Sequence, residues 1–159
     1  MRNAPVIYIV VPCYNEEEVL PLTAEFLGKK LDDLIRSRRI HPGSRVLMVD
    51  DGSKDKTWKL IEEFHEKDER FAGVKLSRNR GHQNALLAGL FEAARRRCDA
   101  AISMDADLQD DVDACDAMIE RYMAGCDIVY GVRRHRTTDT FFKRTTALGF
   151  YKIMNALGA

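Results

Sequence analysis

Two carboxylates and a carboxamide follow directly after an apolar segment in the second half of the chain. The apolar segment runs from Ala100 to Met104, and the acidic run Asp105-Ala106-Asp107-Leu108-Gln109-Asp110 comes next. A short apolar run is typical of a buried strand, and a parallel α/β sheet binds its ligands at the carboxyl ends of its strands. Carboxylate and amide oxygens in one turn suit a hard cation, which keeps positions for water and substrate phosphates. The run therefore predicts a metal-diphosphate site.

A single Asp at a strand end often does no more than cap the helix that follows. Positions 105 to 116, however, hold six Asp and no Lys or Arg. Since capping one helix needs fewer acids than this, we favour the metal-diphosphate interpretation.

A second polar cluster follows the apolar run Val6 to Val11. It consists of Pro12, Cys13, Tyr14, Asn15 and Glu16. The proline ends the ladder, a nucleoside base could stack on Tyr14, and Glu16 could accept its N–H groups. Alternatively, Asn15 and Glu16 begin the next helix.

A third cluster, Asp50-Asp51-Gly52-Ser53, follows the apolar run Arg45 to Val49. Asp50 could accept a hydrogen bond from a ribose or a base, and the glycine permits a tight turn. Ser53 or Asp55 is better suited to cap the helix expected at Thr57 to Lys67.

Strand and helix patterns alternate along the chain and place these clusters. Apolar runs predict buried strands at 6–11, 45–49, 73–77, 100–104 and 128–132. Helical spacing of apolar residues predicts helices at 20–34, 57–67, 82–96, 112–122 and 140–157. This alternation predicts an α/β fold, a mainly parallel, doubly wound, Rossmann-like sheet with right-handed crossovers and helices on both faces.

Composition is consistent with one globular domain over residues 1–159, because 45% of the residues are apolar and 31% are charged. The 25 basic and 25 acidic residues cancel, so we expect no nucleic-acid partner. Charge is instead segregated into the acidic stretch and a basic group after position 132.

Four cysteines show no CxxC spacing, which predicts free thiols in a reducing compartment. The short N-terminal apolar run is broken by Pro12 and is neither a signal peptide nor a membrane span. We therefore expect a cytoplasmic protein.

The motifs, taken in order, resemble those of the family-2 glycosyltransferases of the GT-A fold. They are VPCYNE, VDDGSKDKT, SRNRGHQNALLAGL, MDADLQD and YGVRRHR, and the match runs from Val6 to about Leu157. The resemblance is greatest to the polyprenyl-phosphate branch, which includes bactoprenol glucosyltransferases and dolichol-phosphate mannosyltransferases. It implies a metal-dependent, inverting transfer of a sugar from a nucleotide-sugar donor, with a UDP-sugar favoured over GDP-mannose, to a polyprenyl phosphate or another glycan or lipid acceptor.

The resemblance also implies roles for individual residues. The nucleotide-sugar side would comprise Pro12, Tyr14, Glu16, Asp50, Arg78, Gly81, Asp105 and Ala106. Asp107 and Gln109 would bind Mg²⁺ or Mn²⁺. The catalytic residues would be Asp105, Asp107 and Arg133.

A basic group after the fifth expected strand suits a phosphate acceptor. It contains Arg133, Arg136, Lys143 and Arg144. A phosphate monoester has a second pKa near ~6 and is already an anionic nucleophile at neutral pH, so a polyprenyl phosphate would need no strong general base. We expect the segment 133–157, rich in aromatic and basic residues, to meet the cytoplasmic face of a membrane; the alternative is a terminal helix packed on the core.

Two departures from the family pattern qualify this interpretation. Where many relatives continue with Asp-Pro-Pro-Glu, this chain has Asp110-Asp111-Val112-Asp113, so we expect a looser turn. The chain also ends before the point where relatives continue, so we expect only part of the family's catalytic domain. Two rival functions stay open: a catalytically incomplete nucleotide-sugar-binding module, and a nucleotidyltransferase. The second usually has a Gly-rich phosphate loop after the first strand, which VPCYNEEEV does not provide.

Overall fold

The computed structural model describes residues 4–107 and 109–132. The chain divides into two compact units, Met1–Val129 and Tyr130–Ala159. The elements described below all belong to the first unit.

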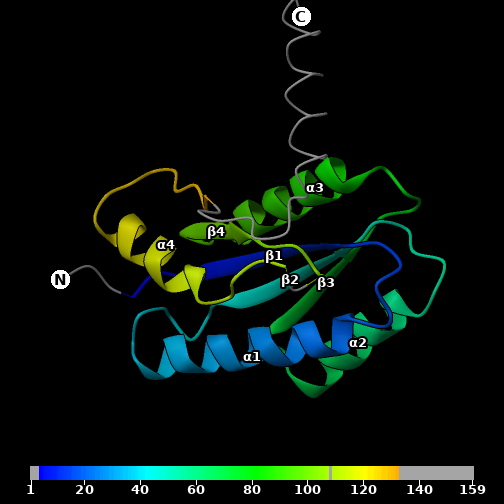
Figure 1. Cartoon of the computed structure of the whole chain (residues 1–159), viewed down its shortest axis with the longest axis horizontal. Helices are drawn as coiled ribbons and strands as arrows, with labels where there is room; N and C mark the ends of the chain where they lie inside the picture. Colours follow the sequence, from blue (N-terminus) through cyan, green and yellow to red (C-terminus); the bar gives the residue numbers. More distant parts are fainter. Residues whose placement is uncertain (1–3, 108, 133–159) are drawn as a thin grey trace, which may run out of the picture. The chain divides into compact units, whose positions relative to one another are not determined.

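Four parallel strands form the sheet. They are β1 (Ile7–Cys13), β2 (Arg45–Asp50), β3 (Phe71–Lys75) and β4 (Ala100–Ser103), in the spatial order β3-β2-β1-β4. Because all pairs are parallel, the chain must cross over between strands, and each crossover contains a helix (Figure 1). The carboxyl ends of the strands consequently lie at one edge.

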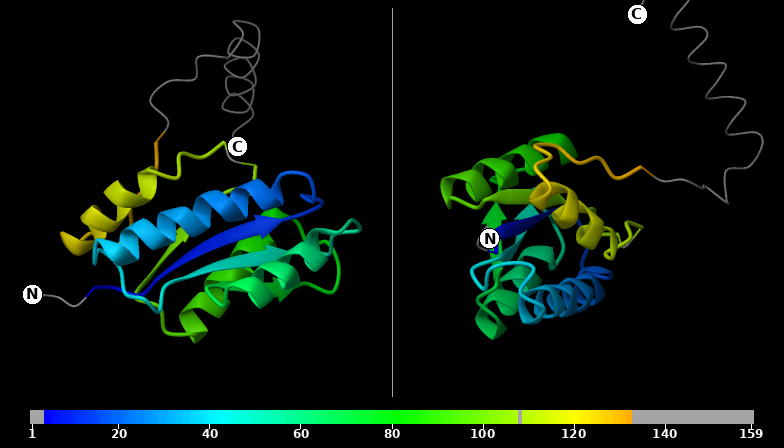
Figure 2. Two further views of the ribbon diagram at one scale, coloured as in Figure 1. Left: turned by 90° about the horizontal axis from the view of Figure 1, so that it is seen from below. Right: turned by 90° about the vertical axis from the view of Figure 1, so that its left-hand side faces the viewer.

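Helices cover both faces of this sheet (Figure 2). The four helices are α1 (Leu20–Arg36), α2 (Thr57–Lys67), α3 (His82–Arg95) and α4 (Ala114–Met123). Buried residues of α1, α2 and α4 pack in one core cluster, and those of α3 pack in a second one. The expected doubly wound α/β architecture is confirmed.

Strand β1 lies between these two cores. Its side chains alternate: Ile7 and Ile9 enter the cluster with α1, whereas Tyr8 and Val10 enter the cluster with α3. Helix α3 approaches closely because it carries Gly89 at the contact. A Cβ at that position would come within 2.4 Å of Val10 Cγ1, so the glycine sets the distance between α3 and the sheet.

Two expected strands differ in the structure. Strand β3 begins at Phe71, two residues before the expected start at Gly73. The strand expected at 128–132 is not formed, and the side chains of Ile128, Tyr130 and Val132 are 70%, 82% and 80% exposed. Alternation of apolar residues cannot supply a ladder partner, and in the described residues β4 ends the sheet with no strand beyond it.

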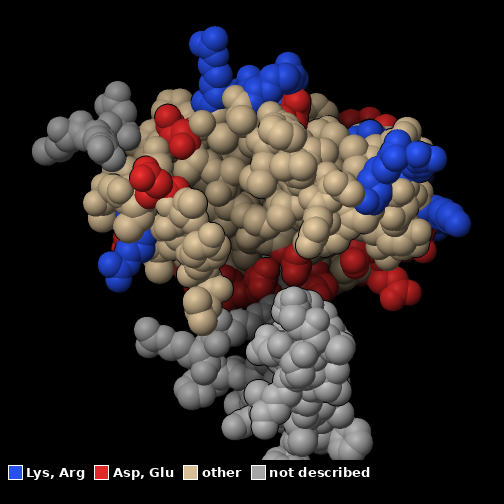
Figure 3. Space-filling view, turned by 90° about the horizontal axis from the view of Figure 1, so that it is seen from above, with Lys and Arg blue, Asp and Glu red and all other residues tan. Residues whose placement is uncertain are grey.

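The surface over α3 is largely uncharged, with Lys and Arg at its margins and Asp and Glu along one rim (Figure 3). Leu87 and Phe91, one turn apart on α3, are among its exposed apolar residues. Among the described residues, no helix combines the length and apolar character needed to cross a bilayer.

Candidate functional site

Four strand-end segments converge at the carboxyl edge of the sheet: residues 12–17, 50–57, 78–82 and 105–110. The proline does not end the ladder as expected, because strand register places Pro12 opposite Val49, and Cys13 opposite Asp50. A hydrogen bond from Asp51 N to Cys13 O, 2.9 Å long, extends this pairing beyond the strands. The sequence motifs therefore meet in space, as the parallel topology requires.

The turns after β1 and β2 are locked together by reciprocal hydrogen bonds. Asn15 N donates to Ser53 Oγ (2.9 Å), and Lys54 N donates to Asn15 Oδ1 (2.8 Å). Further bonds run from Glu16 N to Thr57 Oγ1, from Glu17 N to Asp55 Oδ2 and from Lys56 N to Glu17 Oε2. Asn15 adopts a φ of 56°, a conformation that asparagine tolerates better than most residues. Asn15 thus shapes the loop that carries Tyr14 and Glu16.

The predicted capping of α2 is only partly correct. Ser53 does not cap the helix, because its hydroxyl accepts from Asn15 instead. Asp55 does bond to the helix start, accepting from Thr57 N at 3.0 Å, although Lys56 occupies the N-cap position.

Asp51 fastens the loop before α3 to the end of β2. Its carboxylate, 2% exposed, accepts from Arg80 N at 2.7 Å and from Gly81 N at 2.9 Å. Gly52 lies against the same loop with a φ of 68°, and a Cβ there would come within 2.5 Å of the Arg78 carbonyl carbon. The loop containing Arg78 and Gly81 is therefore fixed to β2.

Asp50 is buried between these segments. Its Oδ1 accepts from Ser53 N at 3.1 Å, whereas Oδ2 has no hydrogen-bond partner among the described residues. A buried acceptor without a partner is costly, so this oxygen is suited to receive an N–H or O–H group from a ligand. Tyr14, 39% exposed, offers an aromatic side chain in the adjoining turn.

The turn after β4 carries Asp105, Ala106 and Asp107. Asp105 Oδ1 lies 3.1 Å from His82 Nε2 at the start of α3. Asp107 Oδ1 accepts from Gln109 N at 3.0 Å. Burial, the nearby Asp107 carboxylate and the Asp55 carboxylate raise the pKa of Glu16. The negative charge of Asp107 therefore disfavours ionisation of Glu16.

Most of the acidic stretch has a structural role, which corrects the argument from its acid count. Asp110 accepts from Asp105 N, and Asp111 accepts from Asp113 N near the start of α4. The other two acids pair with bases of α1 and the turn after it: Lys30 with Asp113 and Asp116, and Arg39 with Asp116. These four Asp contact the acidic stretch itself or α1 and the turn after it, whereas Asp105 and Asp107, whose partners are His82 and Gln109 N, lie just after β4 at the carboxyl edge of the sheet.

The residues here fit a cation that is held jointly with a substrate. Asp107 and Gln109 supply oxygen donors of the kind that Mg²⁺ and Mn²⁺ accept. Within residues 4–107 and 109–132, no three His, Cys, Asp or Glu side chains form a group that could hold a metal ion. Mg²⁺ is usually bound through one or two carboxylates together with water and substrate phosphates, and Asp107 and Gln109 are compatible with such an arrangement.

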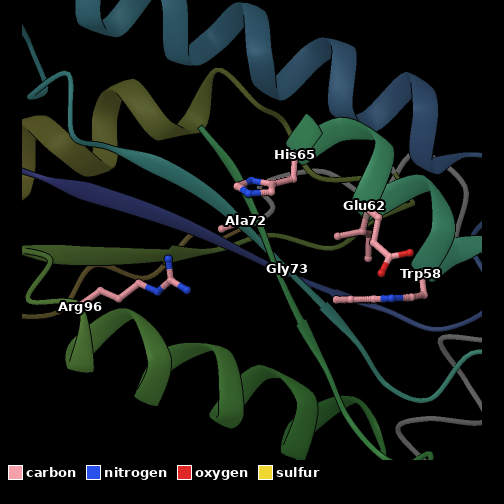
Figure 4. A pocket seen from close by; sticks show the side chains of 7 residues that line it. Trp58, Glu62, His65, Ala72, Gly73 and Arg96 are labelled. Atoms are coloured by element: carbon pink, nitrogen blue, oxygen red, sulfur yellow. The ribbon is translucent and has the colours of Figure 1, made fainter. Parts of the chain in front are cut away.

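Two of the cavities that the described residues form lie near the sheet. One, of about 480 Å³, is lined by residues 15–19 with Lys54 and Asp55, and so adjoins Glu16. The other, of about 290 Å³, runs along the outer edge of β3 between Trp58 and His65 of α2 and Arg96 after α3 (Figure 4). No residue implied by the sequence motifs lines this second cavity.

The expected acceptor residues Arg133, Arg136, Lys143 and Arg144 lie outside the described residues.

All four cysteines are free, as expected. Burial, with Glu16 and Asp50 nearby, raises the pKa of the Cys13 thiol far above its ordinary range, so this cysteine is unreactive despite its position at the edge.

Three residues that contact the strand-end segments were missed by sequence reasoning: Thr23, Asp51 and His82. The hydroxyl of Thr23 on α1 lies 2.7 Å from Ala106 O. A signal for Asp51 was present, because two adjacent acids at a strand end must point to opposite sides. No local pattern marks Thr23, which reads as one more residue of an amphipathic helix.

The site thus places a buried acidic acceptor, an aromatic side chain and an oxygen-rich turn at the carboxyl edge of a parallel sheet, where α/β proteins bind their ligands. The family model for glycosyl transferase family 2 matches residues 8–158. The chain belongs to this family, and the resemblance noted in its motifs is confirmed.

Relatives agree with this assignment. The chain is 55% identical to the uncharacterized glycosyltransferase YkoT of Bacillus subtilis, over 99% of this chain and 46% of the relative. It is 36% identical to the bactoprenol glucosyl transferase of Shigella phage SfV, over 95% of this chain and 46% of the relative. The chain thus spans about half the length of the curated relatives it matches.

Solved structures show the same fold. A mannosyltransferase from Pyrobaculum calidifontis, in complex with GDP-Man and Mn²⁺, matches with 26% identity and a TM-score of 0.50, over 70% of this chain and 30% of that protein. TarS of S. aureus (residues 1–349) matches with 17% identity and a TM-score of 0.55, over 85% of this chain and 40% of that protein. The expected GT-A architecture is confirmed.

Proposed function

We propose that this chain forms the donor-binding part of a metal-dependent, inverting glycosyltransferase. The donor is a sugar attached to a nucleoside diphosphate, and the acceptor is a polyprenyl phosphate. The observation that carries the proposal is the convergence of four strand-end segments at one edge, linked by the Asn15–Ser53, Asp51–Gly81 and His82–Asp105 contacts.

The nucleoside binds on the β1–β2 side of this edge. Tyr14 stacks on the base, and Asp50 Oδ2 accepts a hydrogen bond that no described residue provides. The rigid loop 78–81, held by Asp51, lines the same side through Arg78 and Gly81. Since Asp50 and the loop 78–81 are held by hydrogen bonds before binding, little ordering of these two parts opposes binding of the nucleoside.

The diphosphate binds at the β4 turn. Asp107 and Gln109 hold Mg²⁺ or Mn²⁺, which when bound stabilises the negative charge that develops on the leaving diphosphate. Asp105 faces the ribose and the diphosphate. A cation held there would also offset the effect of the Asp107 charge on Glu16, whose pKa is raised by burial and by Asp107. A relative named bactoprenol glucosyl transferase and a structural neighbour in complex with GDP-Man and Mn²⁺ support this arrangement.

The acceptor side is proposed from the sequence alone. Arg133, Arg136, Lys143 and Arg144 would bind the acceptor phosphate, with Arg133 completing the catalytic set, at the cytoplasmic surface of a membrane. Co-sedimentation with anionic liposomes tests this part: replacing all four bases with Gln should abolish a salt-sensitive association. Equal partitioning of the two proteins would remove the membrane surface from the proposal.

The proposal as a whole is tested in two assays with the same protein. A thermal-shift panel of UDP-, GDP- and TDP-sugars, with Mn²⁺ or EDTA, should show that one donor raises the melting temperature in Mn²⁺. Transfer of radiolabelled sugar to polyprenyl phosphate then separates an enzyme from a binding module. Binding without transfer would favour the incomplete nucleotide-sugar-binding module, and pyrophosphate release from a nucleoside triphosphate would favour a nucleotidyltransferase.

A further inference from the structure

Thr23 makes an unusual contact for a residue inside a helix. A threonine within a helix commonly donates its hydroxyl proton to the carbonyl four residues earlier. Thr23 Oγ1 lies 3.2 Å from that carbonyl, on Val19, but only 2.7 Å from the carbonyl of Ala106. Val19 O already accepts from two backbone N–H groups, those of Leu22 and Thr23. The single hydroxyl proton is therefore directed out of α1 toward Ala106.

Ala106 lies between the two carboxylates directed to the ligand. The residue is 4% exposed and Thr23 is 1% exposed, so water does not replace this bond. Among the described residues no other donor contacts Ala106 O. This carbonyl belongs to the peptide group that joins Ala106 to Asp107. The Thr23 hydroxyl therefore fixes the orientation of that peptide group, and with it the backbone that bears Asp105 and Asp107.

We propose that Thr23 is a positioning residue for donor binding. Its hydroxyl orients the turn 105–107 so that the carboxylates meet the metal and the diphosphate, although Thr23 touches neither. The inference rests on the proposed function and extends it to a residue on α1.

A purely structural role is the competing explanation, and α1 provides a control for it. Lys30 lies two turns beyond Thr23, on the same face, and pairs with Asp113 and Asp116. It thus also ties α1 to the segment after β4, but without contacting residues 105–107. Replacing Lys30 with Met should weaken the packing of α4 on α1 and leave the turn in place.

The test uses three variants of the full chain: Thr23→Val, which removes the hydroxyl at nearly constant shape; Thr23→Ser, which keeps it; and Lys30→Met. Calorimetry measures the affinities for UDP and GDP in Mn²⁺ and in EDTA, and thermal unfolding is recorded for each variant. Thr23→Val should lose about 10- to 100-fold of the Mn²⁺-dependent affinity, the range typical of residues that orient metal ligands. Its affinity in EDTA should equal that of the unsubstituted protein.

Thr23→Ser should retain the Mn²⁺-dependent affinity, and Lys30→Met should lower only the melting temperature. If Thr23→Val does not fold, Thr23→Cys, whose thiol is a weak donor, should show the same loss. Unchanged Mn²⁺-dependent affinity without the hydroxyl, or an equal loss in Lys30→Met, would overturn the positioning role alone. Failure of the unsubstituted protein to bind either nucleotide would overturn the proposed function, and this inference with it.

Discussion

The β2 end and the β4 end of the site differ in how they are held. At the β2 end, Asp51 is 2% exposed and bonds two backbone N–H groups, and five hydrogen bonds join the turns after β1 and β2. At the β4 end, the Asp105 side chain is 49% exposed. That turn is tied to α1 through Thr23 and to α3 through His82.

This difference matches the two parts of the proposed donor. A nucleoside is best met by a preformed pocket, whereas a metal-diphosphate changes its charge during transfer and needs exposed oxygens that the cation, water and phosphates can reach. We therefore expect substitutions at the β2 end to affect folding, and substitutions at the β4 end to affect ligand binding.

The largest effect on stability should come from Gly52→Ala. The new Cβ would collide with the Arg78 carbonyl carbon at 2.5 Å and with Asn79 N at 2.6 Å. The alanine would also have to adopt a φ of 68°, which residues with a side chain rarely do. We expect a loss of about 2–5 kcal/mol in the free energy of unfolding, measured with urea. Gly125→Ala is the matched control, since Gly125 has a φ of 100° with no atom within 4 Å of its Cβ. It should cost about 1–2 kcal/mol, and equal losses would show that the close approach at Gly52 is unimportant.

Asp51→Asn should have the next largest effect. The amide NH₂ group replaces one carboxylate oxygen, so Arg80 N or Gly81 N loses its acceptor on residue 51, and of the two only Gly81 N has another acceptor, Asn79 Oδ1. A loss of about 1–3 kcal/mol in urea unfolding is expected, together with faster hydrogen exchange at these two amides. Asp33→Asn, at an exposed position of α1, should change neither quantity. An Asp51→Asn protein with unchanged stability and slow exchange would contradict the proposal that the Asp51 carboxylate holds residues 80 and 81 to the end of β2.

Acidification should weaken the attachment of α4 to α1. The hydrogen bond from Lys30, opposed by burial and supported by Arg39, lowers the pKa of Asp116 below its ordinary 3.8. Because the folded-state pKa is lowered, the stabilisation is present above about pH 4 and is lost as the pH falls through the folded-state value. Urea unfolding from pH 6 to pH 3 should show a smaller decrease for Asp116→Asn than for the unsubstituted protein. Identical pH profiles would rule out this contribution.

The smallest effect should be seen in Glu16→Gln. Burial and Asp107 raise the pKa of Glu16, so its ionisation opposes folding at neutral pH. The variant should consequently be slightly more stable at pH 7, and this gain should disappear as the pH falls below about 4.5, where the glutamate is protonated in both states. Glu18→Gln, from the same loop, serves as the control. A loss of stability at pH 7 would mean that the Glu16 carboxylate does not face Asp107.

Much of this fold could be predicted from the sequence, because continuous apolar runs and helical spacing are local signals. The apolar runs at β1 and β2 correctly predicted buried parallel strands. The ends of these strands then predicted at which edge of the sheet the site lies. The prediction of a strand at 128–132 was wrong, because alternating apolar residues do not specify a partner strand.

The partners of the acidic residues could not be predicted in the same way. Asp113 and Asp116 resemble Asp105 and Asp107 in the sequence, but they are paired with Lys30, which lies more than 80 residues earlier. Thr23 and Ala106 are equally distant in the chain. Such contacts depend on how α1 packs against the segment after β4, and one sequence contains no local signal for that packing.

Calorimetry of UDP and GDP binding, with Mn²⁺ and with EDTA, to the unsubstituted chain and to Asp107→Ala tests the central claim most directly. We predict that one nucleotide binds more tightly in Mn²⁺ than in EDTA, and that Asp107→Ala loses this difference while keeping the metal-independent affinity supplied by Tyr14 and Asp50. Equal affinities in Mn²⁺ and EDTA for the unsubstituted chain, or no binding of either nucleotide, would contradict the account of a metal-dependent donor site at this edge of the sheet.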